Sequence, residues 1–250
     1  MPRWKDFAAP LLDWLIPARC AFCTKNPAAR GSSLCLGCRQ RLEPVREPWC
    51  PLCGEPWRFA ATVSMSDAAA SHPCPRCLKS PPPFERVRSA FVYREPLKGA
   101  VSRLKFGGDL ALLRPLEELF GEAFGEVVEP GAVIASVPPA PGKLKERGFD
   151  LAHRLARRLA AVHGSSTIRT DLLAPTGEGT EQAGLKYRER EANARLRFRA
   201  AGARLEGTPV VYLVDDVCTT AATLRACAAI LKSQGAGTVR GLTLARTVQE

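Results

Sequence analysis

The stretch Val210–Val211–Tyr212–Leu213–Val214–Asp215–Asp216–Val217–Cys218–Thr219–Thr220–Ala221–Ala222–Thr223 decides the fold of this 250-residue chain. It begins with an apolar run as long as a buried strand, continues with two acidic residues, and then turns through small hydroxylated residues. A helix follows through Leu224, Cys227 and Leu231. A buried strand that leads directly into a helix is typical of an α/β protein with a parallel sheet.

The chain around this stretch repeats the same alternation. The residue pattern predicts further strands over 87–93, 132–137 and 238–245, and helices over 97–104, 116–127 and 151–162. Ser80–Pro81–Pro82–Pro83 is a stiff linker signal that precedes them. We therefore expect a Cys-rich domain over residues 1–83 and an α/β domain with a parallel sheet and helices over residues 84–250. Ligands of such sheets bind at the carboxyl ends of strands, so the loops there are the candidate sites.

The loop after Val214 has the composition of a sugar-phosphate site. Backbone N–H groups at a helix N-terminus and threonine hydroxyls suit a phosphate. Asp215 and Asp216 suit a sugar, because their carboxylates can accept hydrogen bonds from its hydroxyl groups. The alternative is an ordinary helix N-cap, for which Asp and Thr are also favoured residues.

The loop after the strand over 132–137 is basic. Lys143, Lys145 and Arg147 follow that strand and suit a pyrophosphate group. A solvated basic loop is the alternative. The acidic loop after Val214 favours the pyrophosphate interpretation, because the basic loop would then accompany an acidic sugar site.

Eight of the 10 cysteines precede residue 80, all in C-x-x-C pairs. Two such pairs present four thiolates to one tetrahedral zinc ion. A disulfide framework is disfavoured, because the opening residues do not resemble an export signal, and we expect a cytoplasmic protein. Sequential pairing closes the shortest loops, and interleaved pairing also fits. The candidate ligands of one or two structural zinc ions are Cys20, Cys23, Cys35, Cys38, Cys50, Cys53, Cys74 and Cys77, with His72 as a conceivable substitute beside Cys74.

Composition and charge restrict the class of protein. With 46% hydrophobic and 24% charged residues the chain is not wholly disordered. No apolar stretch approaches the ~20 residues of a membrane-spanning helix, so we expect no span. The formal net charge of +11 suits polyanionic partners. Residues up to Phe84 include 11 basic and 6 acidic residues, which give a formal charge of +5. Eight thiolates bound to two zinc ions would lower this charge to about +1. The excess positive charge therefore belongs to the α/β domain.

A basic run supplies a competing hypothesis. Lys186, Arg188, Arg190, Arg195, Arg197 and Arg199 suit single-stranded DNA, or form only a solvated face. Tyr187 and Phe198 are the aromatic residues nearby, and Phe198 is the better candidate for the core. We also interpret Cys218 and Cys227 as small buried hydrophobes.

The Val210–Thr223 stretch resembles the phosphoribosyl pyrophosphate (PRPP) signature of type I phosphoribosyltransferases. The chain as a whole resembles the ComF (ComFC/GntX) family of competence-associated proteins. This likeness rests on the cysteine pairs, on Leu104–Lys105–Phe106–Gly107–Gly108–Asp109, on Val137–Pro138 with Lys143–Leu144–Lys145–Glu146–Arg147–Gly148–Phe149–Asp150, and on Gln182, Leu185, Arg190, Asn193 and Phe198.

The resemblance implies a zinc finger on a phosphoribosyltransferase-like domain that binds PRPP or a related sugar phosphate with Mg²⁺. Asp215 and Asp216 would hold the ribose hydroxyls. The 5′-phosphate would lie against Val217, Cys218, Thr219, Thr220, Ala221, Ala222 and Thr223, and Lys143, Lys145 and Arg147 would hold the pyrophosphate. Single-stranded DNA and competence-machinery proteins are the partners that the family implies, in natural transformation.

The sequence also departs from the family pattern. Ala221 stands in the place of a glycine, and Ala140, Asp150 and Leu151 stand in the places of His, Asn and Gln. If the backbone at Ala221 needs a positive φ, its Cβ costs on the order of 1–2 kcal/mol. The lid expected over 175–181 carries Glu178 and Glu181 where relatives often have Arg. Both a phosphoribosyltransferase and a non-catalytic sugar-phosphate sensor fit this pattern.

Overall fold

The computed structural model describes residues 18–57, 72–164, 166–177, 194, 196–207 and 209–248. Its contacts divide the chain into two compact units, Met1–Glu43 with Arg94–Leu116, and Pro44–Tyr93 with Glu117–Glu250. The first unit contains the first two cysteine pairs, and the second unit contains the other two together with the sheet. The boundary expected between residues 83 and 84 stays a prediction. Among the described helices, none has the length and apolar character needed to cross a bilayer.

Helix α4 (Leu97–Gly107) is the main helix of the first unit, beside α2 (Leu36–Gln40) and the 3₁₀ turn η2 (Leu110–Leu112). Its buried residues are Leu97, Ala100, Val101 and Leu104, which lie on one helical face. The helix ends at Gly108, whose φ of 67° is accessible to glycine without strain. The helix predicted over 97–104 is confirmed. Helix α5 (Leu113–Phe124) follows.

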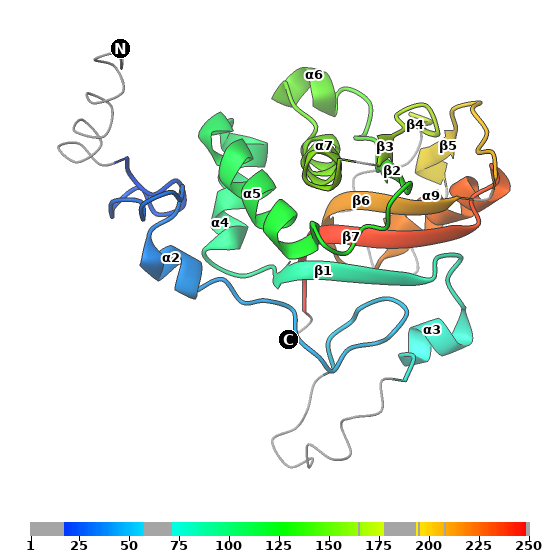
Figure 1. Cartoon of the computed structure of the whole chain (residues 1–250), viewed down its shortest axis with the longest axis horizontal. Helices are drawn as coiled ribbons and strands as arrows, with labels where there is room; N and C mark the ends of the chain where they lie inside the picture. Colours follow the sequence, from blue (N-terminus) through cyan, green and yellow to red (C-terminus); the bar gives the residue numbers. More distant parts are fainter. Residues whose placement is uncertain are drawn as a thin grey trace. The chain divides into compact units, whose positions relative to one another are not determined.

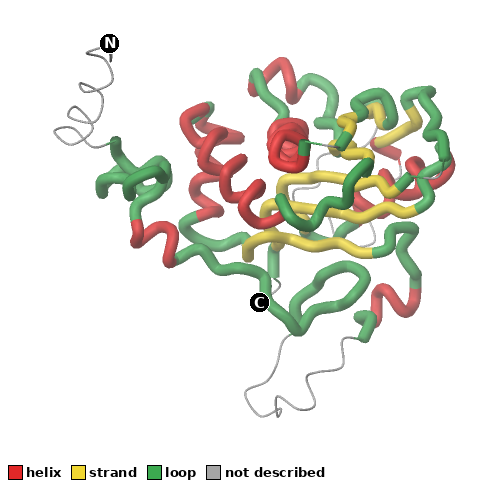
Figure 2. Tube along the Cα trace, in the orientation of Figure 1, coloured by secondary structure: helices red, strands yellow, loops and turns green. Residues whose placement is uncertain are grey.

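The second unit contains a five-stranded sheet (Figures 1 and 2). Its order is β1 (Arg86–Val92), β7 (Thr238–Arg246), β6 (Val210–Cys218), β2 (Val133–Ser136) and β3 (Thr167–Ile168). Every neighbouring pair is parallel. The predicted α/β fold with a parallel sheet is therefore confirmed.

The two helical crossovers leave the centre of the sheet in opposite directions. β2 continues through α7 (Leu151–His163) to β3 at one edge, whereas β6 continues through α9 (Ala222–Ser233) to β7 on the other side. Because such crossovers are right-handed, the two helices cover opposite faces of the sheet. Figure 1 shows α7 lying along one face, above β6. β2 and β6 are therefore the neighbouring strands at which the strand order reverses.

The face covered by α9 holds a continuous core. Val211 and Leu213 of β6 pack with Leu224 and Leu231 of α9, and the second set of four cysteines belongs to the same buried cluster. Helix α3 (Pro75–Lys79) carries one of these cysteines, and the antiparallel strands β4 (Leu173–Pro175) and β5 (Phe198–Ala200) also pack there. The burial of Phe198, Cys218 and Cys227 is confirmed.

Two segments differ from the expected boundaries. β6 runs on through Asp215 to Cys218, because these residues continue to pair with β7 as far as Arg246. Val217 and Cys218 therefore belong to the strand and not to the turn. The basic segment forms a short helix, α6 (Lys143–Arg147), between Gly142 and Gly148, where a loop was expected.

Candidate functional site

The carboxyl ends of β2 and β6 bring together the two loops that carry the predicted ligand-binding residues. Ser136, the last residue of β2, pairs with Val214, and the N–H of Val137 donates to the carbonyl of Val214 over 2.9 Å. β6 then continues past the end of β2, so Asp215 and Asp216 lie where β2 gives way to the loop toward α6. In open α/β sheets, a crevice at the point of strand reversal is where ligands bind.

The two aspartates are half-buried and ordered by local contacts. The N–H of Asp216 donates to Oδ1 of Asp215 over 2.8 Å, and the N–H of Val217 donates to Oδ1 of Asp216 over 2.6 Å. Each carboxylate therefore retains acceptor capacity, since a carboxylate has about four lone-pair positions. A pair of carboxylates in this place can accept hydrogen bonds from vicinal hydroxyl groups or coordinate a divalent cation.

The turn Thr219–Ala221, here called the β6–α9 turn, leads into the N-terminus of α9. Ala221 is buried and has φ 61° and ψ 14°, in the left-handed region that favours glycine. The Oγ1 of Thr220 accepts from the N–H of Ala222 over 3.4 Å. Because φ is positive at Ala221, as considered from the sequence, its Cβ costs on the order of 1–2 kcal/mol. The N-terminus of a 12-residue helix attracts anions.

Helix α6, which follows β2 in the chain, carries the three predicted basic residues. Lys143 forms an ion pair of 3.0 Å with Glu146, and Lys145 is exposed. Arg147 is half-buried. Gly142 and Gly148, with φ values of 82° and 74°, reverse the chain on both sides of this single helical turn. The cations thus belong to a short helix that enters and leaves through left-handed residues.

Asp150 is a further acidic residue, whose carboxyl group interacts electrostatically with that of Asp216. Its side chain accepts from the N–H of His153 over 3.0 Å and caps α7. Burial raises the pKa of Asp150, and the negative charge of Asp216 raises it further, although the contact with His153 opposes this shift. This electrostatic interaction couples the N-terminus of α7 to the aspartates of β6. The sequence had singled out Asp150 only as a departure from the family pattern.

Several predicted residues lie outside the described part of the chain. These are residues 178–181 of the expected lid, and Lys186, Arg188, Arg190 and Arg195 of the basic run. Arg197 and Arg199 are described at β5, where the guanidinium of Arg197 lies 5.5 Å from the ring centre of Phe198. The DNA contact expected for the run stays a prediction.

The cysteines form two groups whose sulfur geometry fits zinc. Each group has its four sulfur atoms within 4.8 Å of one another. Zinc–sulfur bonds of about 2.3 Å in a tetrahedron place the sulfurs about 3.8 Å apart. The sulfurs of Cys23 and Cys35 are 3.8 Å apart, and those of Cys53 and Cys74 are 3.7 Å apart. The first cluster is Cys20, Cys23, Cys35 and Cys38, and the second cluster is Cys50, Cys53, Cys74 and Cys77.

This grouping decides between the pairings that the sequence left open. It is sequential, with two clusters that each fit one structural zinc ion. His72 is not part of the second cluster, and its ring lies 4.3 Å from that of Trp57. In the first cluster, the backbone N–H groups of Asn26 and Lys25 lower the pKa of Cys23 to about 6, which favours the thiolate that a metal requires.

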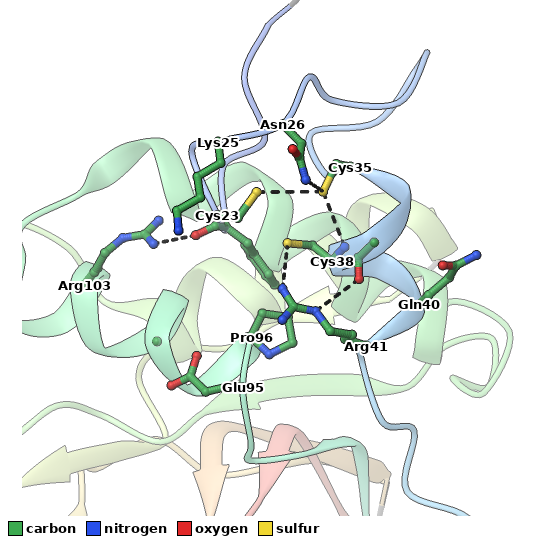
Figure 3. A pocket seen from close by; sticks show the side chains of 13 residues that line it. Cys23, Lys25, Asn26, Cys35, Cys38, Gln40, Arg41, Glu95, Pro96 and Arg103 are labelled. Atoms are coloured by element: carbon green, nitrogen blue, oxygen red, sulfur yellow. Dashed lines mark hydrogen bonds between the residues drawn. The ribbon is translucent and has the colours of Figure 1, made fainter.

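The first cluster lines a cavity of about 670 Å³ (Figure 3). Arg41 donates to the sulfur of Cys38 over 3.7 Å, and the amide of Asn26 lies 4.0 Å from the sulfur of Cys35. Arg103 of α4 donates to the carbonyl of Phe22 over 2.6 Å and to that of Ala21 over 2.5 Å. A zinc ion with four thiolates has two net negative charges, and Arg41 places a positive charge against one of the sulfurs. The cavity is therefore the polar surround of the metal site and not a separate anion site.

Two distant arginines surround the second cluster in the same way. Arg225 of α9 donates to the sulfur of Cys77 over 3.5 Å, and Arg246 of β7 donates to the carbonyl of Cys53 over 2.8 Å. Arg246 also pairs with Glu55, which accepts from Arg76 over 2.7 Å. Sequence reasoning missed Arg225 and Arg246. Their signal was an arginine in an apolar helical stripe and another at the end of an apolar strand, both of which are unusual positions for a charge.

Comparisons with known proteins agree with this architecture. Residues 11–78 match the model of the double zinc ribbon domain. The chain is 27% identical to competence protein ComFC of Bacillus subtilis, over 86% of this chain and 84% of that protein. It is 27% identical to competence protein F of Haemophilus influenzae, over 91% of this chain and 96% of that protein. It is 31% identical to DNA utilization protein YhgH of Shigella flexneri, over 93% of this chain and 99% of that protein. At this identity over nearly the full length of both proteins, the chain belongs to the family of ComFC, competence protein F and YhgH.

Proposed function

We propose that the chain binds PRPP or a related sugar phosphate in the crevice between the ends of β2 and β6, and serves the handling of DNA taken up in natural transformation. One observation carries the first part. At the point of strand reversal, β6 carries two aspartates near its end and leads into the N-terminus of α9, and the neighbouring strand β2 leads into the basic helix α6. The relatives are competence and DNA utilization proteins by name, which supports the second part.

The crevice offers one group for each part of such a ligand. The β6–α9 turn and the N-terminus of α9 suit the 5′-phosphate. Asp215 and Asp216 suit the ribose hydroxyls, directly or through Mg²⁺, which Mg²⁺–PRPP would bring to the site. Lys143, Lys145 and Arg147 suit the pyrophosphate. If the ligand reacts, the same cations would stabilise the charge that develops on the departing pyrophosphate.

Calorimetric titration of the full chain with PRPP and Mg²⁺ tests binding. We expect saturable binding that Asp215→Asn with Asp216→Asn weakens at least tenfold, whereas Asp171→Asn, at an exposed residue outside the crevice, leaves it unchanged. Phosphorus NMR for pyrophosphate release, with a panel of acceptors, then separates an enzyme from a sensor. Binding without release favours the sensor, and no binding by the wild-type chain refutes the site.

A second candidate function is contact with single-stranded DNA through the first unit, which the charge distribution favours. The described residues of this unit include ten Lys or Arg and three Asp or Glu. Residues Arg94–Leu116, which group with the first cluster, supply half of these cations. The domain boundary expected at residue 84 instead assigns the excess positive charge to the α/β domain. Phe106 of α4 is 80% exposed and offers a ring for base stacking.

Fluorescence anisotropy with a labelled oligonucleotide across a salt series tests this contact. We expect the logarithm of the association constant to fall linearly with the logarithm of salt concentration. Phe106→Ala should weaken binding by about 1–3 kcal/mol for one lost stacking contact. Leu144→Ala, at an exposed apolar residue of the other unit, serves as the control. Binding that is insensitive to salt, or equal loss in both variants, would contradict the proposed surface.

A further inference from the structure

Arg225 joins the second cluster to the first turn of α9. Its guanidinium donates to the carbonyl of Ser80 over 2.8 Å and to the sulfur of Cys77 over 3.5 Å. It also lies 5.9 Å from the ring centre of Phe84. The residue is only 8% exposed, and its backbone N–H donates to the carbonyl of Ala221 over 2.9 Å. One residue thus contacts a metal-ligand sulfur with its side chain and the β6–α9 turn with its backbone.

Arg246 joins the same cluster to the other end of the turn. It is fully buried and lies in register with Cys218, the last residue of β6. One nitrogen of its guanidinium donates to the carbonyl of Cys53 over 2.8 Å and to the sulfur of Cys218 over 3.1 Å. The second nitrogen pairs with Glu55. The residue before the turn is therefore fixed to the backbone of a metal-ligand cysteine.

Cys218, which Arg246 contacts, and Arg225 flank the turn in the sequence, and the two arginines help to balance the charge of the cluster. Cys218 immediately precedes the turn, and Arg225 follows it by four residues. A metal-loaded cluster has two net negative charges, and the carboxylate of Glu55 adds a third. The three cations Arg76, Arg225 and Arg246 balance these negative charges. Burial of an unbalanced charge is costly, so each partner depends on the others.

The cluster also packs directly on the sheet. The N–H of Val87 in β1 donates to the carbonyl of Leu52 over 2.7 Å, and the guanidinium of Arg88 donates to that of Pro51 over 3.0 Å. Gly54 has a φ of 69°, and a Cβ there would lie 2.5 Å from the carbonyl oxygen of Val87. The ligand loop of Cys50 and Cys53 is thus held against β1 at a distance that only glycine permits.

We propose that Arg225 and Arg246 couple the second cluster to the β6–α9 turn, so that the turn keeps its shape only while this cluster holds its metal. Loss of the metal releases the four cysteines of this cluster from one another. The sulfur that Arg225 contacts and the Cys53 loop that Arg246 contacts are then no longer held in place, and the contacts that fix Cys218 and the first turn of α9 weaken. The consequence for sugar-phosphate binding rests on the proposed function, whereas the coupling itself does not.

The first cluster provides a matched control. Arg41 donates to a ligand sulfur there as Arg225 does in the second cluster. The side chains of Asn26 and Arg41 contact sulfurs of the first cluster, and neither residue belongs to the proposed sugar-phosphate site. Metal loss at the first cluster should therefore leave the β6–α9 turn unaffected.

Amide hydrogen exchange of the full chain, read on peptides that cover residues 218–225, tests the coupling. The variants are Cys50→Ser with Cys74→Ser, and Cys20→Ser with Cys35→Ser as the control, each with its zinc content measured by mass spectrometry. We expect each double variant to lose one zinc ion. Exchange over residues 218–225 should rise at least tenfold in the former and stay within twofold of wild type in the latter. Unchanged exchange in the former, or equal acceleration in both, would overturn the proposal.

Arg225→Gln and Arg41→Gln form a second pair that keeps all cysteines, for use if a cysteine variant does not fold. Each should speed zinc release from its own cluster by about 10–100-fold, as outer-shell substitutions do. Only Arg225→Gln should accelerate exchange over residues 218–225, and removal of zinc by a chelator should then add little. Normal zinc release and normal exchange in Arg225→Gln would refute the coupling.

PRPP titration of the same variants separates the two proposals. If wild type binds PRPP, we expect at least tenfold weaker binding in Arg225→Gln. If wild type does not bind PRPP, the proposed function fails, and the hydrogen-exchange comparison still decides the coupling.

Discussion

The guanidinium of Arg246 lies 3.1 Å from the sulfur of Cys218, its register partner across β6 and β7. The same guanidinium contacts the backbone of Cys53 and the carboxylate of Glu55. A fully buried arginine thus connects the end of β7, the end of β6 and a metal-ligand loop. Such a residue is held by partners that are far from it in the sequence, and its removal leaves those partners without compensation.

Replacement of Arg246 by Met should therefore destabilise the fold strongly. Arg246→Met leaves the half-buried carboxylate of Glu55 with Arg76 as its remaining cation, and breaking a pair with a fully buried partner costs up to about 3–5 kcal/mol. Urea unfolding measures this loss of free energy. The double variant Arg246→Met with Glu55→Gln should recover part of it, because the unpaired carboxylate is gone. Strictly additive losses would show that the two residues do not interact.

The left-handed conformation of Ala221 predicts that glycine is better at this position. Ala221→Gly removes the Cβ from a residue with φ 61°, which relieves about 1–2 kcal/mol of strain and costs some unfolded-state entropy. We expect a net gain of up to about 1 kcal/mol in unfolding free energy and no weaker binding of PRPP. Ala222→Gly, one residue later and inside α9, should instead destabilise by up to about 1 kcal/mol. A loss in both variants would contradict the strain at Ala221.

The two clusters predict a stoichiometry of two zinc ions per chain. Metal analysis of the full chain should give this number, and Cys23→Ser or Cys74→Ser should each lower it by one. Substitution by cobalt(II) should give the absorption of tetrahedral thiolate coordination at both clusters. Because protons compete with the metal for the thiolates, metal loss should increase as the pH falls. A single ion in wild type, or loss of both ions in either variant, would contradict independent clusters.

Local pattern was sufficient to predict four of the five strands of the sheet, but not β3, the end of β6 or helix α6. The strand of Val210–Val214 and the helix through Leu224 and Leu231 follow from apolar spacing, which depends on neighbouring residues alone. The extension of β6 to Cys218 does not, because its pairing with β7 overrides the local preference of two aspartates.

Long-range contacts account for what the sequence did not reveal. Arg225 and Arg246 contact cysteines that lie more than a hundred residues earlier in the chain. Their spacing contains no sign of a metal site, since the ligand motif is elsewhere. The sequential pairing of the cysteines also needed coordinates, because C-x-x-C spacing is the same in either arrangement. The spacing predicts ligands, and the fold decides which of them meet.

The carboxyl group of Asp150 gives the last prediction, which concerns pH. Burial, with the charge of Asp216, raises the pKa of Asp150 above its ordinary value of 3.8. Between the ordinary and the raised value the folded state binds more protons than the unfolded state, so its stability falls as the pH rises through this window. Above the window the ionised carboxylate destabilises the fold. Asp150→Asn keeps an N-cap acceptor for His153 and removes this charge.

We therefore expect Asp150→Asn to be more stable than wild type at neutral pH, with a gain that shrinks as the pH falls below the window. Urea unfolding from pH 3 to pH 7 measures it. Asp171→Asn is the control of opposite sign, because the contact with Arg169 lowers the pKa of Asp171 and its ionised form is the stabilising one. If the proposed function holds, Asp150→Asn should also tighten PRPP binding, since one negative charge fewer faces a polyanion. A gain that does not change with pH would show that the charge of Asp150 has no part in it.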